Sequence, residues 1–180
     1  LNIGSLERDA PPLFVTIREC GFSHNEAGNG GAVAAWIATG STTPVNLVID
    51  ASVFDGNTAS EGGGALYLSG ALVDVSVFNS SFRSNRATRA GGVVHMSAGA
   101  TLKLRDRTSL ENNAAPQGDM IQSDEDSVAV YVLPGPLSSW VPDALEYCGQ
   151  PCAINGLLPH HRFVTLARTA PFELNGASYP

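Results

Sequence analysis

Carboxylate side chains are the groups of this sequence that could support acid–base catalysis or bind a divalent cation. Two pairs occupy matching positions of a repeated segment, Asp50 with Asp106 and Asp55 with Glu111. Enzymes that cleave acidic polysaccharides need such carboxylates, together with a basic residue, to converge on one face. If the repeats stack as coils of β-structure, the members of each pair lie two coils, or about 10 Å, apart. A phenylalanine or an arginine then lies between them, which disfavours catalysis.

Histidines and cysteines could support nucleophilic catalysis or metal binding. No Ser-His-Asp or Cys-His set can be assembled, because His24 and His95 are expected to project from different faces. Cys148 and Cys152 could form a disulfide in an oxidising compartment, or pair with cysteines of a longer chain. A zinc site that joins them to the histidines at 160–161 lacks a recognised ligand spacing. We therefore expect no catalytic residues, no metal site and no cofactor.

Composition excludes two classes of function. The chain has 180 residues, a formal net charge of -7 and 19 glycines. An acidic surface repels phosphate backbones, so we expect no nucleic-acid binding. No segment approaches the roughly 18 to 20 apolar residues that cross a bilayer, so we expect no membrane span within this chain. Because the sequence begins without an initiator Met or a signal peptide, we expect a mature product or a piece of a longer protein.

A repeat of about 28 residues organises positions 13–123. Each copy has an apolar anchor, a short Asn-x-Ala bend whose asparagine lies three residues later, and a glycine pair followed by an apolar run that predicts a second strand. The anchors are separated by steps of 32, 28 and 28 residues, and a polar turn at 39–44 accounts for the longer first step. The anchors are Phe22, Phe54, Phe82 and Leu110, and the asparagines are Asn25, Asn57, Asn85 and Asn113.

Short runs that alternate apolar and polar residues precede each anchor, as half-buried strands require. They cover residues 14–17, 47–49, 73–77 and 102–104. In a parallel β-helix each residue lies over its counterpart in the next coil, at about 4.8 Å, so rings stack on rings and asparagine amides bond to one another. The sequence therefore predicts an all-β fold, a right-handed parallel β-helix (β-solenoid) of about four to five coils. A glycine-rich β-sandwich is the alternative.

Two further positions of the repeat hold small residues. The glycine pairs predict a turn with positive φ, and Asp119 in the fourth copy tolerates that region. Cys20 belongs to a column expected to point inward, where a free thiol behaves as a small hydrophobe. The other members of this column are Ser52, Ser80 and Thr108.

Charged residues also align between copies. Asp55, Arg83 and Glu111 form a column of alternating sign, and Glu61 matches Arg89 in the next copy. Opposite charges on neighbouring strands stabilise a sheet by about 0.2 to 1 kcal/mol. We therefore interpret the arginine cluster of Arg83, Arg86 and Arg89 as structural, and an anionic ligand as the alternative.

The character of the sequence changes after residue 133. We expect one more strand at 128–133, and frequent prolines from 134 onward leave little room for regular elements. The sequence thus divides into a parallel β-helix at 1–133 and an irregular proline-rich capping or flanking segment at 134–180, which contains the cysteine pair. One added strand is expected at 163–166.

The paired motif resembles the repeats of chlamydial polymorphic outer-membrane proteins and related β-helix segments in large extracellular proteins of algae and other protists. The copy closest to that pattern has F-D-G-N at 54–57 and G-G-A-L at 63–66. The resemblance covers about residues 13–123, while the C-terminal tail is more similar to the protist proteins. It implies a right-handed β-helix, a surface or secreted location and a role in adhesion or assembly, and it carries no catalytic residues.

The strand after each glycine pair carries a candidate binding surface of Trp36, Tyr67 and His95. Exposed aromatic side chains serve carbohydrate binding and protein contacts, unless the C-terminal segment covers them. Asn79 begins an N-S-S sequon for N-glycosylation on a bend, which is consistent with secretion.

The leading hypothesis is a non-enzymatic extracellular scaffold, adhesion or assembly module of a larger cell-surface or secreted protein. Its partners would be other extracellular proteins, further copies of itself in an assembly, or glycans. The alternatives are a carbohydrate-binding module and a polysaccharide lyase or hydrolase.

Overall fold

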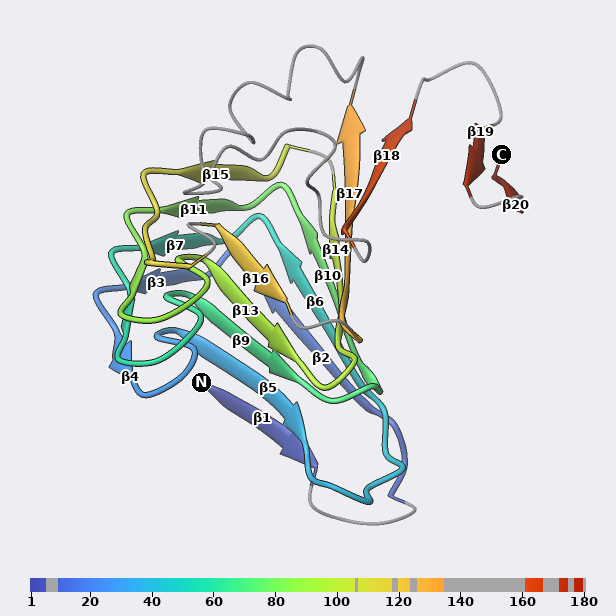
Figure 1. Ribbon diagram of the computed structural model, residues 1–180, viewed down its shortest axis with the longest axis horizontal. Helices are drawn as coiled ribbons and strands as arrows, with labels where there is room; N and C mark the ends of the chain where they lie inside the picture. Colours follow the sequence, from blue (N-terminus) through green and yellow to red (C-terminus); the bar gives the residue numbers. More distant parts are fainter. Residues whose placement is uncertain are drawn as a thin grey trace.

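The computed structural model describes residues 1–5, 10–105, 107–117, 120–123, 126–134, 161–166, 172–174 and 177–179. These residues are all-β, and four parallel sheets stack as a solenoid of about four turns (Figure 1). The predicted parallel β-helix is therefore confirmed. Within the described ranges, no helix is long and apolar enough to cross a membrane.

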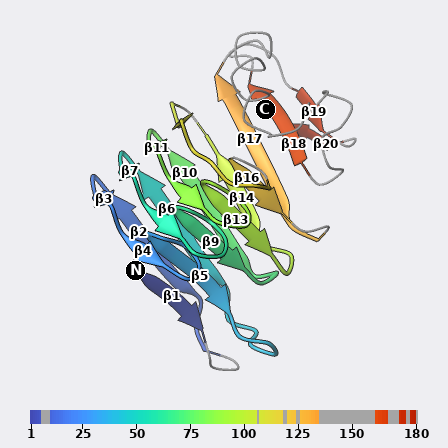
Figure 2. The same ribbon diagram turned by 60° about the vertical axis from the view of Figure 1, so that its left-hand side comes forward.

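Corresponding strands of successive coils lie side by side along the stack (Figure 2). The long sheet comprises β2 (Leu13–Arg18), β6 (Val45–Asp50), β10 (Val73–Phe78), β14 (Thr101–Leu104), β17 (Val128–Pro134) and β18 (His161–Leu166). The anchor sheet comprises β3 (Gly21–Ser23), β7 (Val53–Asp55), β11 (Ser81–Arg83) and β15 (Ser109–Glu111).

Two more sheets complete each coil. The short sheet comprises β4 (Glu26–Ala27), β8 (Thr58–Ala59) and β12 (Arg86–Ala87). The post-glycine sheet comprises β1 (Asn2–Ser5), β5 (Val33–Ile37), β9 (Leu66–Ser69), β13 (Val94–Ser97) and β16 (Ile121–Ser123). A separate antiparallel pair joins β19 (Phe172–Leu174) to β20 (Ala177–Tyr179).

Each full coil has four strands, whereas the sequence predicted two strands and a bend. The difference arises because the anchor and Asn-x-Ala segments also pair in parallel register with the next coil, as in Phe54 with Phe82 and Ala59 with Ala87. The polar turn at 39–44 does lengthen the first coil, since it connects β5 to β6. The strands expected at 128–133 and 163–166 are β17 and β18, and β18 pairs in parallel with β17.

Burial alternates along the long sheet, as the sequence pattern predicts. In β10, Val73, Val75 and Val77 are buried, whereas Asp74 and Ser76 are partly exposed. The same alternation in β6 and β14 places the apolar side chains of successive coils in one continuous core. The anchor rings belong to this core: Phe54 and Phe82 are fully buried and stack with their centroids 4.5 Å apart.

An asparagine ladder runs up the bend between the anchor and short sheets. The amide oxygen of Asn85 accepts hydrogen bonds from the backbone N–H and the Nδ2 of Asn57, at 3.0 and 2.9 Å. Its own Nδ2 donates to Asn113 Oδ1 and to the Phe54 carbonyl, both at 3.0 Å. Asn57 repeats this pattern, with Asn25 as the donor. The ladder therefore satisfies the buried polar groups at the bend.

The two glycines of each pair are required for different reasons. This corrects the expectation that both have a positive φ. Only the first glycine is left-handed, as in Gly63 with φ of +71°. The second is needed for close approach, because a Cβ on Gly64 would collide with the carbonyl oxygen of Gly92 in the next coil. Asp119 takes the place of the second glycine in the fourth copy and lies outside the described residues, so the expectation for it stays a prediction.

Cys20 is exposed, so the expectation of a buried thiol is wrong. Its equivalents Ser52 and Ser80 are buried, because a coil lies on each side of them. Cys20 follows β2, whose described partner is β6 alone, and its thiol donates to the Arg18 carbonyl at 3.1 Å. The division at residues 133 and 134 stays a prediction.

Candidate functional site

Two of the carboxylates that could act in catalysis, Asp50 and Asp55, contact basic or amide groups. Asp50 pairs with Arg18 at 3.1 Å and accepts a hydrogen bond from Asn79 Nδ2 at 3.1 Å. In the next coil, Phe78 is in register with Asp50, and the guanidinium of Arg105 lies 5.5 Å from the centroid of the Phe78 ring. Its predicted column partner at 106 lies outside the described residues. At the C-terminal ends of β6 and β10, this column therefore holds a carboxylate and an aromatic ring, each in contact with an arginine.

The second acidic column is interrupted by a cation, whereas the first has Phe78 next to Asp50. Arg83 lies in register between Asp55 and Glu111, and its guanidinium is 3.0 Å from the Asp55 carboxylate. Such an exposed pair contributes roughly 0 to 1 kcal/mol. The two acids therefore do not converge on one site.

Ion pairing explains Arg83 but not the rest of the arginine cluster, which corrects the structural interpretation of that cluster. Arg86 and Arg89 are exposed, and neither forms an ion pair with a described residue. Arg89 does lie beside Glu61, since its backbone N–H donates to the Glu61 carbonyl. The Glu61 carboxylate, however, accepts from Asn29. Two cations of this coil are thus available to a ligand.

The candidate binding surface lies on the outer face of the post-glycine sheet. Tyr67 is in register with His95, and their rings meet edge to face with centroids 5.6 Å apart. Trp36 lies diagonally from Tyr67, and its Nε1 donates to Asn2 Oδ1 at 2.6 Å. All three side chains are partly buried. The structure therefore brings Trp36, Tyr67 and His95 onto one face.

Strand β1 supports this face and was missed by sequence reasoning. The indole of Trp36 lies over Gly4, where a Cβ would come within 2.5 Å of the ring. Asn2 and Gly4 match no copy of the repeat, so the repeat pattern does not predict their contact with Trp36. The only sequence signal is an asparagine and a glycine two residues apart, which suit a strand packed against a tryptophan.

We expect the Trp36 indole to be quenched by acrylamide to an intermediate degree in a Trp140→Phe background, because the ring is partly buried against β1. Asn2→Ala should raise the quenching constant, since it removes the hydrogen bond that holds the indole. Stern–Volmer titration measures both effects. A fully protected indole would show that the face is covered and would remove it as a binding surface.

The remaining predicted site residues are a modification site and a cysteine pair. Asn79 is exposed and lies at a bend with φ of +45°, so the first residue of the sequon is accessible. Its glycosylation stays a prediction. Cys148, Cys152 and the neighbouring histidines of the zinc alternative fall in a part of the chain whose side chains are not described.

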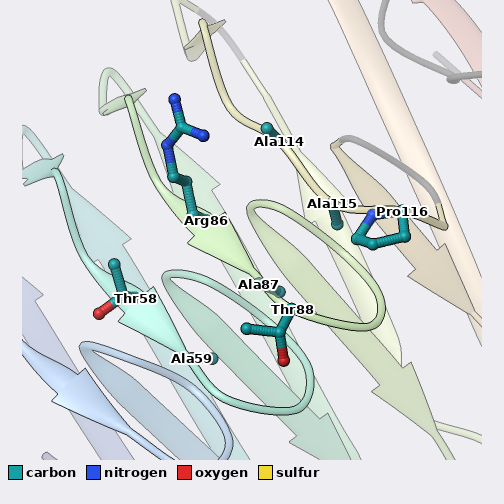
Figure 3. Close-up of a pocket in the computed structure, with 8 residues that line it drawn as sticks. All are labelled: Thr58, Ala59, Arg86, Ala87, Thr88, Ala114, Ala115 and Pro116. Carbon is teal, nitrogen blue, oxygen red and sulfur yellow. The ribbon is translucent and has the colours of Figure 1, made fainter.

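A groove over the short sheet was not predicted. It has a volume of about 410 Å³ and crosses three successive coils (Figure 3). The Asn-x-Ala segment places small residues there, but its sequence predicts only a bend. The groove is lined by Thr58, Ala59, Arg86, Ala87, Thr88, Ala114, Ala115 and Pro116.

In a comparison with known families, residues 51–69 match the Chlamydia polymorphic membrane protein repeat. That segment holds the buried anchor Phe54, the ladder residue Asn57 and the glycine turn that leads into β9. Searches of curated proteins and of solved structures gave no match. The matched segment lies within one copy of the repeat, and the copies beside it stack on it in register.

Proposed function

We propose that this chain, a β-helix repeat protein resembling the chlamydial membrane protein repeat, is a non-enzymatic scaffold, adhesion or assembly module of a cell-surface or secreted protein. The observation that carries the proposal is the stacked repeat itself. Ring and amide ladders connect coil to coil, which makes a rigid rod whose sides are free to present contacts. Other extracellular proteins or further copies of the chain would be its partners.

Adhesion is tested by coating beads with the folded chain and measuring their attachment to cultured cells, with beads that carry the heat-denatured chain as the control. Sedimentation velocity tests self-assembly in parallel. We expect attachment or concentration-dependent association for the folded chain alone. Beads that attach no better than the denatured control, together with a chain that stays monomeric, would overturn the proposal.

We expect no turnover of uronate-rich or sulfated polysaccharides, because Asp50 and Asp55 each pair with an arginine of a neighbouring coil. Release of reducing ends and absorbance of unsaturated products measure turnover. Cleavage that Asp50→Ala or Asp55→Ala abolished would establish the lyase or hydrolase alternative instead.

A carbohydrate-binding module is the second candidate, and the aromatic face of Trp36, Tyr67 and His95 favours it. Aromatic rings offer apolar surface to sugar rings, and hydroxyls at Ser69 and Ser97 lie on the same face. A glycan array distinguishes this alternative. Binding lost in Tyr67→Ala but kept in Phe14→Ala, which changes an exposed ring on β2, would support it.

A further inference from the structure

The groove over the short sheet has the dimensions of a short extended chain. It runs from Thr58 across β12 to Pro116, which spans two coil spacings, or about 10 Å. An extended peptide advances about 3.3 Å per residue, so three residues fit this length. Ala59 and Ala87 line the groove but are almost fully buried, so its accessible apolar groups belong mainly to Ala114, Ala115 and Pro116.

One cation lies on this groove. The exposed Arg86 lines it and forms no ion pair or hydrogen bond with a described side chain, and its register neighbours Thr58 and Ala114 are uncharged. The Thr58 hydroxyl forms no hydrogen bond within the described residues, whereas the Thr88 hydroxyl donates to the Ser60 carbonyl. An arginine with free donors matches a carboxylate, which it binds through two parallel hydrogen bonds.

One residue that lines the groove also has a backbone acceptor without a ladder partner. In the earlier coils the backbone N–H of Ser60 donates to the Ala27 carbonyl, and that of Thr88 donates to the Ala59 carbonyl, both at 3.0 Å. Pro116 occupies the next position and has no N–H, so the Ala87 carbonyl does not receive the equivalent bond. The backbone N–H of Ala87 donates to the Ala114 carbonyl, so both Ala87 groups are directed toward the fourth coil. An unpaired carbonyl favours a ligand that brings an N–H donor.

We propose that this groove binds an extended peptide segment that carries a carboxylate and small apolar side chains. Arg86 pairs with the carboxylate, the Ala87 carbonyl accepts a peptide N–H, and the side chains of Ala115 and Pro116 contact the apolar side chains of the peptide. A saccharide fits less well, because the lining has no aromatic ring and few polar groups for its many hydroxyls. This inference rests on the proposed function, for which it supplies a partner surface.

The test is an NMR titration of the ¹⁵N-labelled full chain with acetyl-Val-Glu-Val-amide and, separately, with acetyl-Val-Gln-Val-amide. We expect shifts centred on Thr58, on β12 and on Ala114–Ala115, and weaker binding of the glutamine peptide. Arg86→Gln should weaken binding of the glutamate peptide about fivefold, the scale of an exposed ion pair. Arg89→Gln, which removes the same charge outside the groove, should leave it unchanged.

Pro116→Ala tests the carbonyl separately. The backbone N–H gained at this position can donate to the Ala87 carbonyl and close the ladder. Binding of the glutamate peptide should then weaken, while the new amide becomes protected from hydrogen exchange. Equal affinity for the two peptides, equal effects of Arg86→Gln and Arg89→Gln, or shifts away from the groove would overturn the proposal. If bead attachment persists while the peptide fails to bind, the groove is refuted and the proposed function still holds.

Discussion

Asn85→Ala is expected to lower the free energy of unfolding by about 4 kcal/mol, because it removes four buried hydrogen bonds, each contributing roughly 1 kcal/mol, and leaves a buried backbone N–H without a partner. The Asn85 side chain makes four hydrogen bonds and is fully buried. Its removal leaves the backbone N–H of Asn57 without a partner, and the Asn57 Nδ2 keeps only its hydrogen bond to the Phe22 carbonyl. Urea denaturation of the full chain, followed by circular dichroism, measures the change.

Asn25→Ala is the matched control for this prediction. Asn25 stands at the exposed end of the ladder, and its side chain makes one hydrogen bond in the ladder, from Nδ2 to Asn57 Oδ1 at 2.8 Å. We expect a loss of about 1 kcal/mol or less, the ordinary contribution of one hydrogen bond. Equal losses in Asn25→Ala and Asn85→Ala would contradict a ladder whose interior rungs are buried and whose end is open to water.

The stacking of this fold was predictable because the repeat places identical residue types at one register. Phenylalanine and asparagine recur at equivalent positions of successive copies. In a β-helix, equivalent positions of neighbouring coils lie over one another, so each of these side chains contacts its own kind. The sequence could not distinguish interior coils from the first one. Cys20 and Ser52 occupy the same column, yet one is exposed and the other buried, since burial depends on neighbours on both sides.

The candidate sites were less predictable, because they depend on departures from the repeat. Trp36 and Tyr67 could be placed on one face from strand alternation, but the contact of Trp36 with β1 involves residues that follow no pattern. The groove arises where Pro116 interrupts a backbone ladder, and a proline in a turn-like segment has many explanations in sequence alone. Only the register of the fourth coil shows which carbonyl it leaves unpaired.

Phe54→Ala is expected to destabilise the fold by about 4 kcal/mol, the usual cost of truncating a buried phenylalanine and leaving a cavity. Phe54 is fully buried between two parallel rings, with centroids 4.8 Å from Phe22 and 4.5 Å from Phe82. The substitution removes both ring contacts, and coils on either side limit how far the cavity can collapse. Thermal and urea unfolding of the full chain give the measurement.

Phe22→Ala separates stacking from general apolar content, since it deletes the same side chain from the end of the same column. Phe22 is half-buried and contacts one ring, so we expect a loss of about 2 kcal/mol or less. The ratio of the two losses therefore reports the position of each ring in the stack. If Phe22→Ala cost as much as Phe54→Ala, the first coil would have to be covered on its outer side, and the open end inferred from the exposure of Cys20 would be wrong.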